Sequence, residues 1–417
     1  MPNLPNFKEC CGCGACVDAC PKKAIELVED KRCFYNIKID KSACVECKLC
    51  EQRCHILHPE LLIKSDPTHT QPIAAWSTTE ELIKYSATGA IFAQIASNML
   101  KEHGNTYVYG ATLQNDNSVR HIEISNLEEI RKLQNSKYQQ SYCVGIYSQV
   151  KKRLKEGSRV LFSGVPCQIA ALYSFLRYNA QLIENLYTIE VLCHGVPCND
   201  IHRVALKSHK AAHIYAYRNK DGRGWCGNKG NNNRLSYIRH NGERFIISSY
   251  QKDIMYRSYL SFNYSRPSCY SCRYANIHRV ADLTIGDFWG WERTPNPEKY
   301  KNYWGTSVVL PNTDKGINMM KGNNLHCVET TWREFLPINQ NLYMPTNIYD
   351  YKGYRYMSFV KYLPTQIKKI IYQSGFSNRR LNRLYEKFLS LVYRRKRRTA
   401  IAEKEKMSNY ILKQLEK

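Results

Sequence analysis

Cysteine is the residue whose number and spacing most clearly indicate chemistry in this chain. Ten of its eighteen cysteines lie between Cys10 and Cys54. Two motifs with the same gaps of two, two and three residues account for eight of them: Cys10, Cys13, Cys16 and Cys20, then Cys44, Cys47, Cys50 and Cys54. In proteins with two four-iron clusters, three thiolates of each motif hold one cluster and the fourth ligates the other. The spacing predicts two [4Fe-4S] clusters, one on Cys10, Cys13, Cys16 and Cys54 and the other on Cys44, Cys47, Cys50 and Cys20.

Zinc and plain buried thiols are the alternatives for these cysteines. Structural zinc usually joins two C-x2-C pairs and does not need a third cysteine in each. The residues between the motifs, AIELVEDKRCFYNIKID at 24–40, alternate in polarity around a polar turn and predict a hairpin. Residues 1–62 therefore resemble a bacterial-type ferredoxin domain, in which Cys11 and Cys33 fall outside the motif spacing.

The rest of the chain must position any further site, and its pattern alternates between strands and helices. Strands are expected at 73–78, 106–113, 119–125 and 186–191, helices at 91–100, 147–157 and 200–210, and a strand, tight turn and helix at 159–176. Such alternation favours an α/β core. The small residues of SATGA, at 86–90, could approach a phosphate at a helix start, although they are more commonly only the start of a helix.

Four further cysteines fall near predicted turns. Cys167 lies in SGVPCQ and Cys193 in CHGVPC, and Cys269 and Cys272 have C-x2-C spacing in PSCYSC. Together they could close a third cluster. Two alternatives remain open: Cys167 as a nucleophile beside His194, and ordinary buried cysteines.

Several segments in this order resemble the beta subunit family of coenzyme F420 hydrogenase/dehydrogenase, which includes plant hydroxymethyl chlorophyll reductase. They are KYSATGAIFAQIA, TYVYGATL, SKYQQSYCVG, SRVLFSGVPCQIAAL, CHGVPC and ADLTIGDFWG. The resemblance implies an FAD-containing oxidoreductase with a further [4Fe-4S] cluster on Cys167, Cys193, Cys269 and Cys272. It also implies flavin contacts from Ser86, Thr88, Gly89, Ala90, Lys137, Ser141, Gly286 and Asp287. It names no catalytic acid or base, although His194 is a candidate on its chemistry.

We therefore expect an iron–sulfur flavoprotein oxidoreductase. It would pass electrons between an external one-electron carrier, the clusters, FAD and a two-electron substrate or coenzyme, with coenzyme F420 among the candidates. A flavin can join one-electron and two-electron chemistry because it is stable in three redox states. The expected partner is a ferredoxin or another oxidoreductase subunit. A non-catalytic electron-transfer subunit and a thiol-dependent transferase are the competing hypotheses.

The predicted fold is an α+β ferredoxin-like N-terminal domain, an α/β flavin-binding domain and a helical basic C-terminal extension. We expect boundaries at 1–62, 72–155 and 156–335 for the ferredoxin segment and the two parts of the α/β domain, and at 336–417 for the tail. With no signal peptide and no apolar run long enough to span a bilayer, the expected location is the cytoplasm, where thiols stay reduced.

The charge of the chain is strongly positive and uneven. The net charge is +25, and residues 350–417 hold 18 Lys and Arg against 5 Asp and Glu, a net of +13. This tail could contact an anionic membrane surface, dock an acidic partner, or be a solvated helical extension. No nucleic-acid-binding module is recognisable, so a nucleic acid is not an expected partner.

Overall fold

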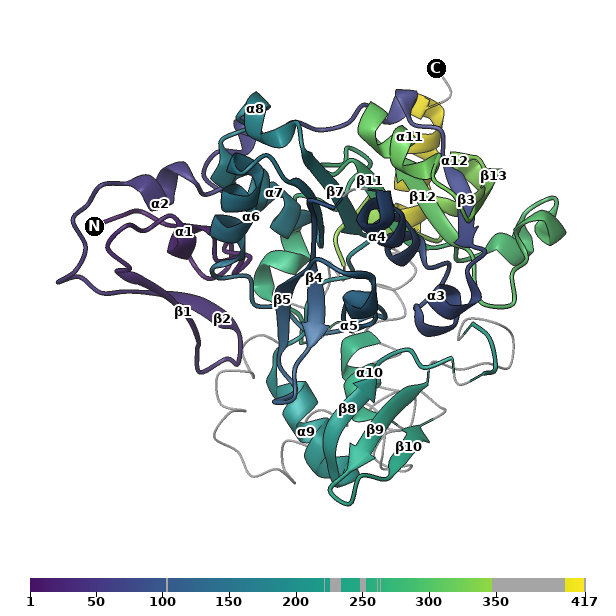
Figure 1. Cartoon of the computed structure of the whole chain (residues 1–417), viewed down its shortest axis with the longest axis horizontal. Coiled ribbons are helices and arrows are strands. Elements are labelled where there is room, and N and C mark those ends of the chain that lie inside the picture. Colours follow the sequence, from purple (N-terminus) through teal and green to yellow (C-terminus); the bar gives the residue numbers. More distant parts are fainter. Residues whose placement is uncertain are drawn as a thin grey trace.

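A mixed eight-stranded sheet lies at the centre of the computed structural model, which describes residues 1–102, 104–220, 222–225, 234–247, 253–260, 262, 264–346 and 402–415. Its strand order is β13-β3-β12-β11-β7-β6-β4-β5 (Figure 1). The strands are β3 (Ile73–Ser77), β4 (Thr106–Leu113), β5 (Val119–Ile124), β6 (Arg159–Gly164), β7 (Leu186–Val191), β11 (Leu283–Asp287), β12 (Ser307–Pro311) and β13 (Leu325–Glu329). Most of the predicted basic tail, from 347 to 401, lies outside the described residues.

Four neighbouring strands, β11, β7, β6 and β4, run parallel, and antiparallel strands flank them on both sides. Strand β6 is buried on both faces: Val160 and Phe162 point into one apolar cluster and Leu161 into another. A central parallel strand is expected to be apolar throughout for this reason. Ligand sites in such sheets usually lie at the carboxyl ends of the parallel strands.

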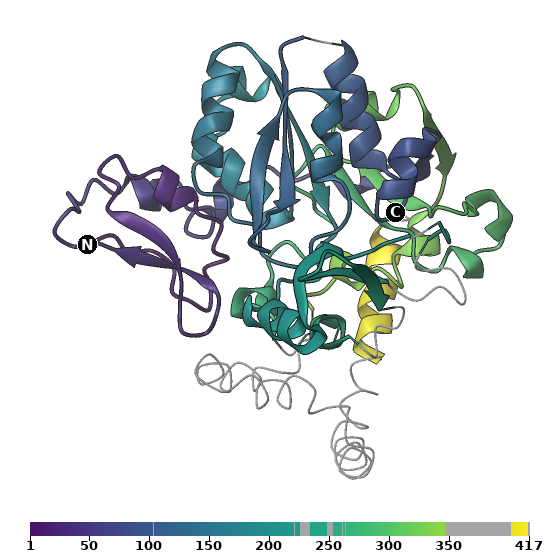
Figure 2. The same ribbon diagram turned by 60° about the horizontal axis from the view of Figure 1, so that its bottom comes forward.

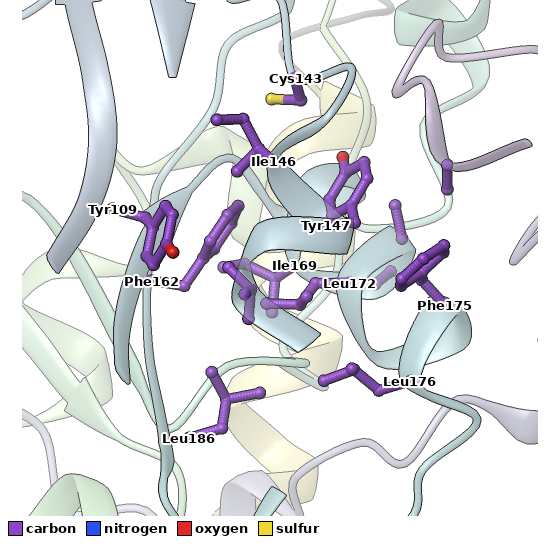
Figure 3. Packing of buried hydrophobic residues seen from close by; sticks show 14 of the residues in the cluster. Tyr109, Cys143, Ile146, Tyr147, Phe162, Ile169, Leu172, Phe175, Leu176 and Leu186 are labelled. Atoms are coloured by element: carbon purple, nitrogen blue, oxygen red, sulfur yellow. The ribbon is translucent and has the colours of Figure 1, made fainter. Parts of the chain in front are cut away.

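Helices cover both faces of the sheet, as the alternating sequence pattern predicts. Tyr147, Ile169, Leu172 and Phe175 pack beneath β6 on the face covered by α6 and α7 (Figure 3). The helices are α3 (Glu80–Tyr85), α4 (Ile91–Glu102), α5 (Ile130–Leu133), α6 (Ile146–Lys155), α7 (Pro166–Leu176), α8 (Ala180–Ile183), α11 (Asp314–Met320) and α12 (Trp332–Phe335). None of the helices in the described part of the chain is long and apolar enough to cross a bilayer.

The cysteine-rich N-terminal segment forms a small unit at one side of the sheet domain (Figure 2). It contains α1 (Ala15–Asp18), the predicted hairpin of β1 (Ile25–Glu29) and β2 (Tyr35–Ile39), and α2 (Leu49–Gln52). Asp18 attaches this unit to α6: the Gly145 and Ser148 N–H groups donate to its carboxylate at 2.6 and 3.1 Å. A carboxylate at a helix N-terminus is stabilised by the free N–H groups there.

A second, three-stranded sheet stands below the main one, in the order β10-β9-β8. It comprises β8 (Ala211–Ala216), β9 (Leu235–Arg239) and β10 (Arg244–Ile247) and packs with α9 (Asp200–His209) and α10 (Ile254–Leu260). Cys33 and Cys198 are buried in the apolar cluster of this subdomain. Near the C-terminus, residues 402–415 are helical, and Ile411 packs into the apolar cluster around Trp225 and Phe288.

Candidate functional site

The first predicted ligand set converges on one small cavity in the N-terminal unit. Cys10, Cys13, Cys16 and Cys54 all line this cavity of about 20 Å³, together with Cys11 and His55. Burial and the nearby thiols of Cys10, Cys54 and Cys50 raise the pKa of Cys16 well above its ordinary value. The structure therefore brings Cys54 of the second motif to three thiols of the first, as the crossed ligation pattern requires.

The second predicted set lies farther from the sheet domain. Cys20 and Cys50 pack in one apolar cluster with Cys16 and Ile25. Burial raises the pKa of Cys50, and the neighbouring Cys20 thiol adds to the rise. Cys47 is exposed and Cys44 partly so, and the loop between them exposes Val45. This motif is therefore the one that faces solvent.

The four cysteines of the body come from three separate turns and meet in one large cavity of about 600 Å³. Cys167 is the second residue of α7, Cys193 follows β7, and Cys269 and Cys272 lie in and just after a 3-10 turn at Pro267–Ser271. Burial and the neighbouring thiols of Cys193 and Cys272 raise the pKa of Cys269. The pKa of Cys167 is raised well above its ordinary value by a hydrogen bond with Cys11 and by burial. A nucleophilic thiol needs the opposite shift.

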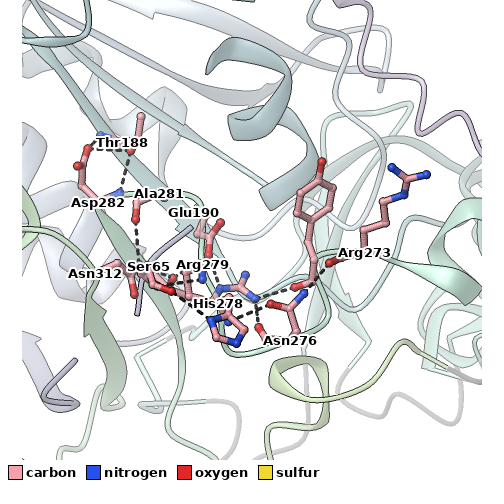
Figure 4. A network of polar contacts seen from close by, with 12 residues as sticks. Ser65, Thr188, Glu190, Arg273, Asn276, His278, Arg279, Ala281, Asp282 and Asn312 are labelled. Carbon is pink, nitrogen blue, oxygen red and sulfur yellow. Dashed lines mark hydrogen bonds and ion pairs between the residues drawn. The ribbon is translucent and has the colours of Figure 1, made fainter. Parts of the chain in front are cut away.

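A buried ion pair attaches the turn that carries Cys272 to the strand that carries Cys193. Arg279 and Glu190 pair through Nε and Oε1, with exposed side-chain fractions of 2% and 0% (Figure 4). Arg279 also donates to the Tyr274 and Asn276 carbonyls, both at 2.7 Å. Thr284 donates to the same Glu190 oxygen at 2.7 Å. The network fixes the spacing of the two cysteine-bearing segments.

The predicted flavin contacts meet at the same large cavity. Seven of the eight line it: Ser86, Thr88, Ala90, Lys137, Ser141, Gly286 and Asp287. Gly89 is the exception, because it packs on the sheet: its N–H donates to Ser307 Oγ at 3.1 Å. A Cβ there would lie 2.5 Å from the Ala75 carbonyl oxygen. A side chain at position 89 would prevent this close packing. The packed turn places the neighbouring residues Ser86, Thr88 and Ala90 at the wall of the cavity.

Basic side chains form part of the wall of this cavity, among them Lys137 and Arg218. Burial lowers the pKa of Lys137 to about 7, and its Nζ donates to the Leu133 and Gln134 carbonyls at 2.9 and 2.6 Å. Arg218 pairs with Asp287 at 2.7 Å. Buried Lys220 donates to the Thr88 carbonyl at 2.9 Å and so stabilises the SATGA turn from behind. Phosphate groups are the anions that such a wall would favour.

A polar network that the sequence did not single out also lines this cavity. His121 Nε2–H donates to the Ser163 carbonyl at 2.8 Å, so Nδ1 is left as an acceptor for the Ser141 hydroxyl at 2.9 Å. Gln168 donates to Ser141 Oγ at 2.8 Å and accepts from the Val165 N–H at 3.0 Å. Burial lowers the pKa of His121 to about 4 and keeps the ring neutral. The Pro-Cys-Gln sequence at the start of α7 was the only signal for this arrangement.

The residues present fit the predicted groups. Four half-buried thiols that raise one another's pKa need positive charge to become thiolates, and iron supplies it. The large cavity has the size typical of small-molecule and cofactor sites. In the described part of the chain, the buried Gln139 Oε1 in its wall has no hydrogen-bond partner, as expected of a side chain that binds a ligand.

Two segments of the chain match known protein families. Residues 157–331 match the family described as the C terminus of the coenzyme F420 hydrogenase/dehydrogenase beta subunit, and residues 9–56 match the 4Fe-4S dicluster domain. No curated protein matches the chain. One similar solved structure is a chain of the F420-reducing [NiFe] hydrogenase complex from Methanosarcina barkeri, with 16% identity and a TM-score of 0.42, covering 74% of this chain and 92% of that one.

Proposed function

Because this chain belongs, through residues 157–331, to the coenzyme F420 hydrogenase/dehydrogenase beta subunit family and carries a 4Fe-4S dicluster domain before that segment, we propose that it is an iron–sulfur flavoprotein oxidoreductase. It passes electrons between an external one-electron carrier and a two-electron substrate or coenzyme. We assign two [4Fe-4S] clusters to the N-terminal unit, a third to the body, and FAD to the large cavity.

One observation carries this proposal: the four body cysteines and seven of the eight predicted flavin contacts line the same cavity. The family resemblance assigned the four cysteines to a cluster and the other group to a flavin. No pattern in the sequence required the two groups to lie at the same cavity. A thiol-dependent transferase would not need phosphate-binding charge and four thiols in one space.

The arrangement of the thiols suggests where the two ends of the proposed route lie. The second motif exposes Cys47 to solvent, where a protein carrier can approach. The first motif lies against the body, since Tyr147 donates to the Cys13 carbonyl at 3.1 Å. We therefore propose that electrons pass to or from the external carrier at the Cys44–Cys47 loop, and to or from the substrate at the large cavity.

FAD would link the one-electron chemistry of the clusters to the two-electron chemistry of the substrate. Within the cavity, Lys137 and Arg218 would hold its phosphate groups. The Ser141 hydroxyl donates its proton to His121 Nδ1. A lone pair of Ser141 Oγ would then accept a hydrogen bond from the bound molecule. We place the protein in the cytoplasm, where its thiols stay reduced.

The substrate can be identified by the compound that bleaches the bound flavin. The full chain, purified and kept without oxygen, should be mixed separately with reduced ferredoxin, reduced coenzyme F420 and a reduced nicotinamide coenzyme. Bleaching by ferredoxin and by one of the two coenzymes supports an oxidoreductase with two substrates. Cluster reduction in a chain that binds no flavin favours the competing function, a subunit that only relays electrons to a partner enzyme.

A further inference from the structure

The N-terminal unit departs from the repeated cysteine spacing at two positions that meet in space. Cys11 is an additional thiol directly after Cys10, and His55 follows Cys54 where Pro21 follows Cys20 in the first motif. The Sγ of Cys11 and the Nε2 of His55 are 3.4 Å apart. Two residues that look like unrelated exceptions in the sequence are therefore partners.

His55 continues this contact into the body of the protein. Its side chain is fully buried, and its other ring nitrogen, Nδ1, hydrogen-bonds with the Tyr274 hydroxyl. Tyr274 stands two residues after Cys272, one of the four thiols of the body. A short hydrogen-bonded path thus runs from the residue next to Cys54 to a residue near Cys272.

Cys11 makes a second connection between the same two groups of thiols. It lines both the small cavity and the large one, beside Cys13 in both and with Cys167 in the large one. Its position is fixed by the body, since Gln140 donates to the Cys11 and Gly12 carbonyls at 3.0 and 2.9 Å.

Close packing holds this contact in place. Gly12 has a positive φ of 67°, and a Cβ on it would lie 2.8 Å from both Arg266 and Gln140. Arg266 is fully buried and donates to the Cys10 carbonyl at 2.8 Å. The first motif therefore has little freedom to move relative to the body thiols.

We propose that Cys11, His55 and Tyr274 form a bridge that couples the first N-terminal cluster to the body cluster, and we name these three residues the bridge. The inference rests on the proposed function. The step concerned would move one electron between the first cluster and the body cluster, so that one of them is oxidised and the other is reduced. No proton or bond is transferred, and the bridge residues act by position, because hydrogen-bonded contacts carry electronic coupling better than an open gap.

The test compares three variants of the full chain with matched controls. Cys11→Ala removes the thiol, His55→Pro restores the residue of the first motif, and Tyr274→Phe removes only one hydroxyl. Cys198→Ala and Tyr343→Phe are the controls, since both residues lie outside the two cavities. Each protein is assayed for iron and sulfide, for the magnetic interaction between reduced clusters by electron paramagnetic resonance, and for flavin reduction by reduced ferredoxin, which is too large to enter the cavity.

The bridge predicts full iron content in Cys11→Ala and Tyr274→Phe, with flavin reduction slowed about tenfold, the scale of changes in residues around metal ligands. It also predicts a weaker magnetic interaction, while the controls match the parent chain. Unchanged rates and spectra in the bridge variants would overturn it. Loss of four iron atoms in Cys11→Ala would overturn it too, by making Cys11 a ligand. A parent chain without clusters or flavin would instead refute the proposed function.

Discussion

Cys11 Sγ and His55 Nε2 lie 3.4 Å apart, at the contact between the N-terminal unit and the sheet domain. Neither residue belongs to the repeated cysteine spacing. Each of them also contacts the body: His55 Nδ1 hydrogen-bonds with the Tyr274 hydroxyl, and Gln140 donates to the Cys11 carbonyl at 3.0 Å. These two contacts fit the unit to the body. Buried Arg266 supports the same conclusion, because it joins the Cys10 and Tyr35 carbonyls of the unit at 2.8 and 2.7 Å.

Loss of one body thiol should remove one cluster and leave the others. Cys269→Ala is expected to lower the iron content by about four atoms per chain, from about twelve, as four-iron clusters require. Cys198→Ala is the matched control, because Cys198 is a fully buried cysteine that belongs to the apolar cluster of the second sheet and lies outside the large cavity. Iron and sulfide assays of the two variants measure this difference. Equal iron content in the two variants would contradict the assignment of the third cluster.

Flavin binding should weaken as the pH rises through about 7. Burial lowers the pKa of Lys137 to about 7, so the side chain is charged below that pH and neutral above it. Loss of one charge-assisted hydrogen bond is expected to weaken binding about tenfold or more. Titration of the flavin-free chain at several pH values measures this change.

The Lys137→Met variant should bind flavin weakly at every pH in this range. Lys132→Met is its control, since Lys132 is exposed and pairs with Glu129 on the surface. If Lys137→Met keeps the pH dependence of the parent chain, another group is responsible and the role given to Lys137 is wrong.

The ion pair between Arg279 and Glu190 should matter greatly for stability. Arg279→Met leaves the Glu190 carboxylate buried without its partner, and such a loss costs about 3–5 kcal/mol. The double variant Arg279→Met/Glu190→Gln should recover part of this loss. Denaturant unfolding of the two proteins measures the difference. Equal stability of Arg279→Met and the parent chain would mean that the network in Figure 4 does not hold the cysteine-bearing turn.

The stability of the protein should fall as the pH drops below about 6.5. His121 has a pKa of about 4 in the folded chain, against about 6.5 when unfolded. Between these values the unfolded state binds the extra proton, so stability is complete above about 6.5 and declines towards about 4. One such group contributes about 1.4 kcal/mol per pH unit.

A His121→Gln variant tests this directly, with exposed His69→Gln as the control. The unfolding free energy of His121→Gln should change less steeply with pH than that of the parent chain. His69→Gln should keep the slope of the parent chain. The same slope in all three proteins would show that His121 is not held neutral.

Much of the architecture could be predicted from local patterns. The polar turn at 30–33 predicted the hairpin of β1 and β2, and the apolar run at 159–164 predicted β6. Periodicity identifies such elements because burial on one or both faces dictates which residues are apolar. The mixed sheet order, with β3 between β12 and β13, could not be predicted, since it depends on contacts between distant segments.

The site could be predicted only in part, for a related reason. Motif spacing identified the eight cysteines of the N-terminal unit, because a cluster imposes its geometry on a short loop, whereas the four body cysteines were grouped through the family resemblance. His121, Gln168 and Arg218 were missed, since a lone polar residue in a strand or at a helix start has no distinctive spacing. Cys11 was set aside as lying outside the motif, and its place becomes apparent only from its contact with His55 and from its position beside Cys167 in the large cavity. Predictions for the basic tail between 347 and 401 lie outside the described residues.

The most direct test of this account is the content of the full chain purified without oxygen. Iron, acid-labile sulfide and flavin should be measured per chain, followed by electron paramagnetic resonance after reduction. The account predicts about twelve iron and twelve sulfide atoms, one FAD, and signals from interacting clusters. A colourless, zinc-containing protein without flavin, silent after reduction, would contradict it.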